Sequence, residues 1–98
     1  MDITFDPAKN ARNIALHGVS FVRAAEFEWI DALIEEDRRR DYGECRYQAL
    51  GRIESRLHML VYTPRSDRVH VISLRKANRR EERRYAEKTQ AKTQTNGS

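Results

Sequence analysis

The chain has 98 residues, which suffices for one domain with a single hydrophobic core. Hydrophobic residues make up 39% of it and charged residues 35%, a polar composition that still argues against wholesale disorder. The single cysteine, Cys45, excludes an intramolecular disulfide and a metal site built from cysteines. No secretory signal opens the sequence and no apolar run reaches the length of a membrane span, so we expect a cytoplasmic protein.

Positive charge is concentrated in the last third of the chain. The formal net charge is +4, but residues 1–64 carry a net −2 and residues 65–98 a net +6. Such asymmetry indicates a surface for a polyanion, or for an acidic protein partner, near the C-terminus. A solvated C-terminal helix is the alternative that charge alone leaves open.

The first elements in chain order are a short strand and two helices. Residues 3–5 have strand character, and a helix is expected from Pro7 to His17, with Asp6 as its N-cap. Gly18 should end it. A second helix, capped by Ser20, is expected to run to about residue 27 and to begin its buried side at residues 21 and 22.

Four further strands and a final helix follow. Strands are expected at residues 32–36, 45–53, 57–63 and 69–74, with a polar hairpin loop at 35–44 and a turn at 64–67. A helix should extend from Ala77 to about Thr89. Consecutive strands with helices beside them predict an α+β fold with a mainly antiparallel sheet, two N-terminal helices on one face and a basic C-terminal helix. We expect one domain over residues 1–90 and a flexible tail over 91–98.

Strand alternation predicts one apolar and one mixed sheet face. The apolar face, expected against the N-terminal helices, would include Ala49, Ile53, Leu57, Met59, Val61, Val69 and Val71. The mixed face, expected to bind a partner or to hold an active site, would include Arg46, Gln48, Arg52, His58, Tyr62 and His70.

The C-terminal helix gathers arginines on one side. At 100° per residue, four of them fall within an arc of roughly 140°: Arg79, Arg80, Arg83 and Arg84. The helix can be an exposed element held by ion pairs one turn apart, or a phosphate-binding cluster of guanidinium groups. Arg75 and Lys76, at the junction of strand and helix, can likewise be ordinary strand-end polarity or contacts to a substrate phosphate.

Motifs for metal, nucleotide or acyl-transfer chemistry are missing from the sequence, which has no glycine-rich phosphate loop, HExxH, CxxC or nucleophile elbow. We therefore expect no metal and no cofactor. RNA cleavage needs neither, because the ribose 2′-hydroxyl can attack its own phosphate. Arginine and lysine can stabilise the charge of that reaction, while Glu, Tyr or His can move protons.

Three stretches in order resemble the BrnT toxin family of bacterial type II toxin–antitoxin systems. They are "FDPAK" with the "HGVSF" that follows it, "GECRYQALG" at residues 43–51, and "VISLRKANRREERRY" at residues 71–85. The resemblance covers residues 5–85. Two positions depart from the family pattern: Leu74 replaces a small residue, and His70 replaces a basic one.

This resemblance implies a RelE-like ribonuclease fold and growth arrest through RNA cleavage. It also implies a cognate BrnA-type antitoxin, which binds DNA and represses the shared operon as a complex with the toxin. The other reading of the sequence is a non-catalytic module that uses its basic helix to bind nucleic acid or to dock an antitoxin.

The family motifs and the distribution of basic residues together suggest which residues form the site. Arg46, Arg75 and Arg80 are expected to contact the phosphate or the transition state. Glu81 and Tyr85 are candidates for proton transfer or for orienting those arginines; a purely structural salt bridge from Glu81 is the alternative. Further RNA contacts are expected from Arg68, Lys76, Arg79, Arg83 and Arg84. Lys9, Asn13 and His17 share one stripe of the first helix and are expected to be mainly structural.

Overall fold

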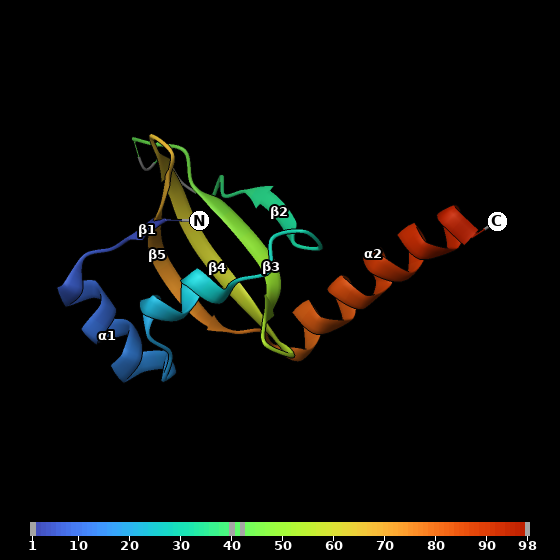
Figure 1. Cartoon of the computed structure of the whole chain (residues 1–98), viewed down its shortest axis with the longest axis horizontal. Helices are drawn as coiled ribbons and strands as arrows, with labels where there is room; N and C mark the ends of the chain where they lie inside the picture. The colour runs from blue at the N-terminus through green and yellow to red at the C-terminus, as the bar shows by residue number, and fades with distance from the viewer. Residues whose placement is uncertain (1, 40, 42, 98) are drawn as a thin grey trace.

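A computed structural model describes residues 2–39, 41 and 43–97, with side chains as far as Gln90. It contains a five-stranded sheet in the order β1–β5–β4–β3–β2, in which only β1 and β5 run parallel (Figure 1). The strands are β1 (Ile3–Thr4), β2 (Leu33–Glu36), β3 (Tyr47–Ile53), β4 (Arg56–Arg65) and β5 (Arg68–Lys76). The helices are α1 (Pro7–His17), the 3-10 helix η1 (Phe21–Glu26) and α2 (Arg79–Gly97). The predicted α+β class is confirmed.

Local signals set the bounds of α1. The Asp6 carboxylate accepts a hydrogen bond of 2.8 Å from the Ala8 N–H, which caps the first turn. Gly18 adopts the left-handed conformation at φ 72°, and its N–H donates to the Ile14 carbonyl at 2.8 Å. The helix therefore begins and ends where the sequence predicts.

Asn13 joins α1 to the sheet. Its amide nitrogen donates to the carbonyls of Val19, at 2.9 Å, and of Leu74, at 2.7 Å. Its amide oxygen accepts from the Leu74 N–H at 3.4 Å. One buried side chain thus satisfies both backbone groups of a β5 residue, as a neighbouring strand would. Lys9 and His17, on the same stripe, are exposed.

The second N-terminal helix is η1, a 3-10 helix. Its buried side consists of residues three apart, Phe21, Ala24 and the capping Phe27, which matches three residues per turn. Val22, expected on the buried side, is exposed instead. That expectation was wrong because it assumed the wider turn of an α-helix.

The faces of β4 are the reverse of those expected. The two-residue turn at Glu54 and Ser55 pairs Ile53 with Arg56, and so Ala49 with Leu60. Cross-strand partners share a face, which places the even residues of β4 against η1. His58 and Tyr62 therefore lie on the helix side, and the other face holds Leu57, Met59 and Val61. Both faces of β4 are buried, so the hydrophobic pattern alone did not distinguish them.

A bulge in β5 shifts its alternation. Val61 pairs with Ser73 but Tyr62 pairs with Val71, which leaves Ile72 as the extra residue. Val71 and Leu74 consequently both enter the core beneath α1 and η1. Ile72 and Ser73 both reach the opposite face of the sheet.

The sheet has a hydrophobic cluster on each face. The larger one packs on η1, and Gly51 is required there because a Cβ atom would collide with the Phe27 ring. The smaller cluster lies beneath the start of α2 and contains Leu50, Leu57, Met59, Val61, Ala77 and Tyr85. From there α2 projects away from the sheet (Figure 1).

The observed bounds of α2 differ from the expected ones. It begins at Arg79 and continues to Gly97, beyond the expected end near Thr89. None of the helices in the described part of the chain is long and apolar enough to cross a membrane.

Candidate active site

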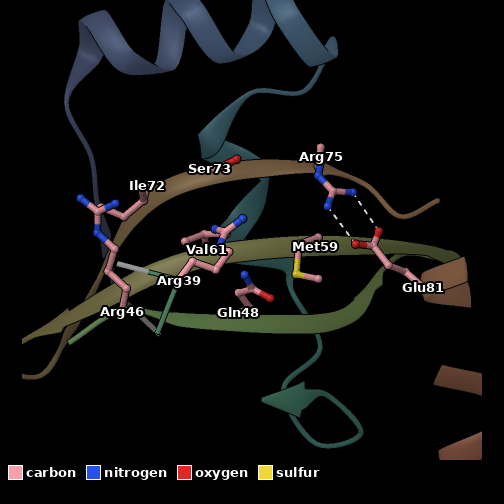
Figure 2. Close-up of a pocket in the computed structure, with 9 residues that line it drawn as sticks. All are labelled: Arg39, Arg46, Gln48, Met59, Val61, Ile72, Ser73, Arg75 and Glu81. Atoms are coloured by element: carbon pink, nitrogen blue, oxygen red, sulfur yellow. Dashed lines mark hydrogen bonds and ion pairs between the residues drawn. The ribbon is translucent and has the colours of Figure 1, made fainter. Parts of the chain in front are cut away.

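A cleft of about 440 Å³ opens on the sheet face opposite α1 and η1. The strands form its floor, the β2–β3 loop supplies two arginines, and α2 supplies one carboxylate (Figure 2). Its lining consists of Arg39, Arg46, Gln48, Met59, Val61, Ile72, Ser73, Arg75 and Glu81.

Arg75 is fixed in this cleft by Glu81. Its Nη1 and Nη2 atoms donate to Oε1 and Oε2 of the carboxylate, each at 2.8 Å (Figure 2). The two side chains are 32% and 14% exposed, so water screens this pair less than a surface pair. The hydrogen bond to Arg75 is the main cause that lowers the pKa of Glu81, and the same bond raises the pKa of Arg75.

Glu81 also belongs to the N-terminal cap of α2. The Asn78 side chain accepts from the Glu81 N–H at 2.8 Å, and Glu81 Oε1 accepts from the Asn78 N–H at 2.9 Å. This is a reciprocal capping box. The beginning of α2 and the orientation of Arg75 therefore depend on one carboxylate.

Arg39 approaches the cleft from the β2–β3 loop. Its Nε and Nη2 atoms donate to the two carboxylate oxygens of Asp37, each at 2.8 Å. The Asp37 backbone N–H donates to the Arg46 carbonyl at 2.7 Å, which closes the base of the loop. The β2–β3 connection thus contributes two guanidinium groups to the same cleft.

The charge of the cleft suits an anion. Three guanidinium groups face it with one lining carboxylate, and Gln48 and Ser73 add uncharged hydrogen-bonding groups. Across residues 2–39, 41 and 43–97, no three His, Cys, Asp or Glu residues form a group that could hold a metal ion.

The structure brings some of the predicted site residues together. Arg46, Arg75 and Glu81 line the cleft, whereas Arg80 is exposed and lies outside its lining. Tyr85 is buried in the smaller hydrophobic cluster, with the Arg52 guanidinium 5.4 Å from the centre of its ring. A catalytic role for Arg80 or Tyr85 stays a prediction.

The basic residues predicted to bind RNA lie outside the cleft lining, at several places on the molecule. Arg79 and Arg83 line a shallow concavity on α2, and Lys76 lies beside His58 on the other sheet face. Arg68 is exposed at the start of β5. Arg84 is half-buried, and its charge contributes to the lowered pKa of Glu81.

Sequence reasoning missed Arg39. It was read as part of a polar loop, although an arginine run beside an aspartate just before a mixed-face strand could have drawn attention to it. Its position depends on the ion pair with Asp37 and on the backbone bond of Asp37 to Arg46, which the sequence alone does not reveal.

A small α+β domain with an arginine-lined cleft on its open sheet face is typical of a protein that binds a polyanion such as RNA. The family model described as "Ribonuclease toxin, BrnT, of type II toxin-antitoxin system" matches residues 5–81. The chain therefore belongs to the BrnT family of ribonuclease toxins, whose type II systems pair the toxin with a cognate antitoxin. No curated protein matches the chain.

Proposed function

We propose that this toxin is a metal-independent endoribonuclease and that its cleft binds the scissile phosphate between Arg46 and Arg75. The observation that carries the proposal is the bidentate Arg75–Glu81 pair at the cleft wall. A guanidinium held in this way meets a phosphate in a fixed orientation, without reorganising as the reaction proceeds.

The reaction is an intramolecular transesterification. The ribose 2′-oxygen bonds to phosphorus and gives up its proton to solvent. The bond from phosphorus to the 5′-oxygen breaks, and that oxygen takes up a proton from solvent. The products are a 2′,3′-cyclic phosphate and a 5′-hydroxyl. Negative charge builds on the phosphate oxygens in the transition state, where Arg46 and Arg75 stabilise it.

Glu81 acts in this scheme as a positioning residue. Both of its oxygens accept hydrogen bonds from Arg75, and one also accepts from the Asn78 N–H. Since these contacts lower its pKa, the carboxylate is a weak base at neutral pH. Holding Arg75 is the role that its geometry favours over proton transfer.

The proposal extends to partners and location. The basic residues outside the cleft would add RNA contacts that position the strand: Arg68, Lys76, Arg79, Arg80, Arg83 and Arg84. The antitoxin would be of the BrnA type, binding DNA and repressing the shared operon together with the toxin. Since its substrate would be RNA, the toxin would act in the cytoplasm.

Purified toxin incubated with RNA in EDTA tests the enzymatic proposal. We expect cleavage that leaves cyclic phosphate ends, that EDTA does not reduce, and that added antitoxin suppresses. Loss of cleavage in EDTA, with recovery on adding a divalent cation, would contradict metal independence. Salt-sensitive binding of RNA that stays intact, with or without ribosomes, would favour the non-catalytic binding module instead.

A further inference from the structure

We propose that Arg39, positioned by the buried Asp37, forms a second phosphate subsite that binds the RNA phosphate next to the one held between Arg46 and Arg75. This inference rests on the proposed function of the same cleft. It assigns to Arg39 a contact that orders the substrate, separate from the charge stabilisation by Arg46 and Arg75.

The burial of Asp37 is the first observation. Its side chain is 0% exposed, while that of its partner Arg39 is 68% exposed. Burying a carboxylate is costly unless it is paired and hydrogen-bonded. Here the pair is bidentate, and the Asp37 carboxylate also accepts from the Arg39 backbone N–H at 3.2 Å. The buried partner thereby fixes the direction of an exposed guanidinium.

The second observation is that Asp37 serves both arginines. Its backbone N–H bonds to the Arg46 carbonyl at 2.7 Å, directly before β3 begins at Tyr47. Arg39 and Arg46 both line the cleft (Figure 2). Asp37 therefore holds the guanidinium of Arg39 through its side chain and the backbone of Arg46 through its N–H.

The third observation concerns the opposite wall. There Glu81 of α2 holds Arg75 of β5. The bond to Glu81 raises the pKa of Arg75, and the positive charge of Arg39 counteracts part of that rise, which is the direction expected from repulsion across the cleft. Phosphates of one RNA strand bound along the cleft would relieve this repulsion. Two separately held cationic groups fit two successive phosphates better than one.

Arg38 provides a matched control. It precedes Arg39 in the same loop and pairs with Glu36 at 2.8 Å, but its side chain is 82% exposed and lies outside the cleft lining. Arg38→Ala and Arg39→Ala remove the same charge from adjacent positions. Only Arg39→Ala removes a group from the proposed subsite.

The experiment measures kcat and KM on a short RNA with one cleavage site. We expect Arg39→Ala to raise KM roughly tenfold while kcat changes less than about threefold, as for loss of a phosphate contact away from the reacting atoms. Its salt slope for RNA binding should fall by about 1. Asp37→Asn should raise KM by a smaller factor, and Arg38→Ala should match the wild type. Two further substrates each carry one uncharged methylphosphonate, either 5′ or 3′ of the scissile phosphate. With one of these two substrates, Arg39→Ala and wild type should have the same KM.

Three results would overturn the subsite. The first is equal KM values for Arg39→Ala and Arg38→Ala. The second is an Arg39→Ala variant that loses only kcat. The third is an Arg39→Ala variant whose KM stays raised to the full extent on both methylphosphonate substrates. Arg39→Ala leaves the buried Asp37 carboxylate without its ion pair, so each variant is first shown to be folded. If Arg39→Ala does not fold, the double variant Asp37→Asn/Arg39→Ala, which removes both charges, replaces it in the comparison with Arg38→Ala. If the wild type cleaves no RNA, the proposed function fails. Binding of a 2′-deoxy analogue to the same two variants then tests the subsite by itself, and equal affinities would overturn it.

Discussion

Arg75 and Glu81 are joined by two parallel hydrogen bonds of 2.8 Å, across the junction where β5 ends and α2 begins. The same carboxylate caps α2 through the Asn78 N–H. The Glu81 side chain thus has two roles: it completes the capping box of α2, and it orients the Arg75 guanidinium that is a candidate for catalysis. The predictions below separate these roles.

The lowered pKa of Glu81 predicts an acid-dependent contribution to stability. A carboxyl whose pKa is lower in the folded state than its ordinary 4.5 stabilises the fold above about pH 4.5 and loses this contribution as pH falls through the folded pKa. Glu81→Gln keeps a capping side chain but removes the charge. In urea unfolding, wild type should be more stable than Glu81→Gln by about 0.5–2 kcal/mol at pH 7, and the difference should shrink below pH 4.5. A difference that is constant with pH would contradict this.

Asn13→Ala should destabilise the fold without changing the cleft. The variant leaves buried backbone groups of Val19 and Leu74 without partners, at a cost of about 1–3 kcal/mol for each. Chemical denaturation should therefore show a marked loss of unfolding free energy, with kcat retained below the melting temperature. Lys9→Ala, on the same helix stripe but exposed, is the control and should change stability by less than about 0.5 kcal/mol.

Tyr85→Phe tests whether this buried tyrosine moves a proton. Its ring packs in the cluster beneath α2, and the residue is outside the cleft lining. We expect cleavage rates within about threefold of wild type, since the packing of the ring is kept. A loss of 100-fold or more in kcat with normal stability would instead assign Tyr85 to proton transfer.

Arg80→Ala distinguishes a catalytic from a general RNA contact. Arg80 is exposed and outside the cleft, so we expect a lower salt slope for RNA binding, by about 1, and a kcat within threefold of wild type. Arg79→Ala, the adjacent exposed arginine, is the comparison. A much greater loss of kcat in Arg80→Ala than in Arg79→Ala would support the catalytic role that the sequence suggested.

Local sequence signals predicted the parts of the fold that depend on local structure. The bounds of α1 followed from Asp6, Pro7 and Gly18, each of which acts within one helical turn. The type of η1 did not follow, although the spacing of Phe21, Ala24 and Phe27 carried the signal. A three-residue period is easily read as part of an α-helix.

Features that depend on contacts between distant parts of the chain could not be predicted from the sequence. Both faces of β4 are buried, so the polarity of its residues did not show which face packs on the helices. The two-residue turn after Ile53 determines this face, because it sets the register between β3 and β4. The cleft shows the same limit. Arg46, Arg75 and Glu81 were predicted and do line one cleft, while Arg39, which also lines it, comes from a connection between strands whose course no local pattern predicts.

A double-mutant cycle on Arg75 and Glu81 tests the central claim most directly. The measurement is the single-turnover rate of RNA cleavage at saturating enzyme, for wild type, Arg75→Ala, Glu81→Gln and the double variant, each confirmed to be folded. Removing one preorganised charge-stabilising group costs about 100- to 1,000-fold in rate, which is the loss expected for Arg75→Ala. If Glu81 acts by holding Arg75, Glu81→Gln should slow the wild type but add almost nothing in the Arg75→Ala background. Equal, multiplicative losses from Glu81→Gln in both backgrounds would contradict this and assign Glu81 a role of its own in the chemistry.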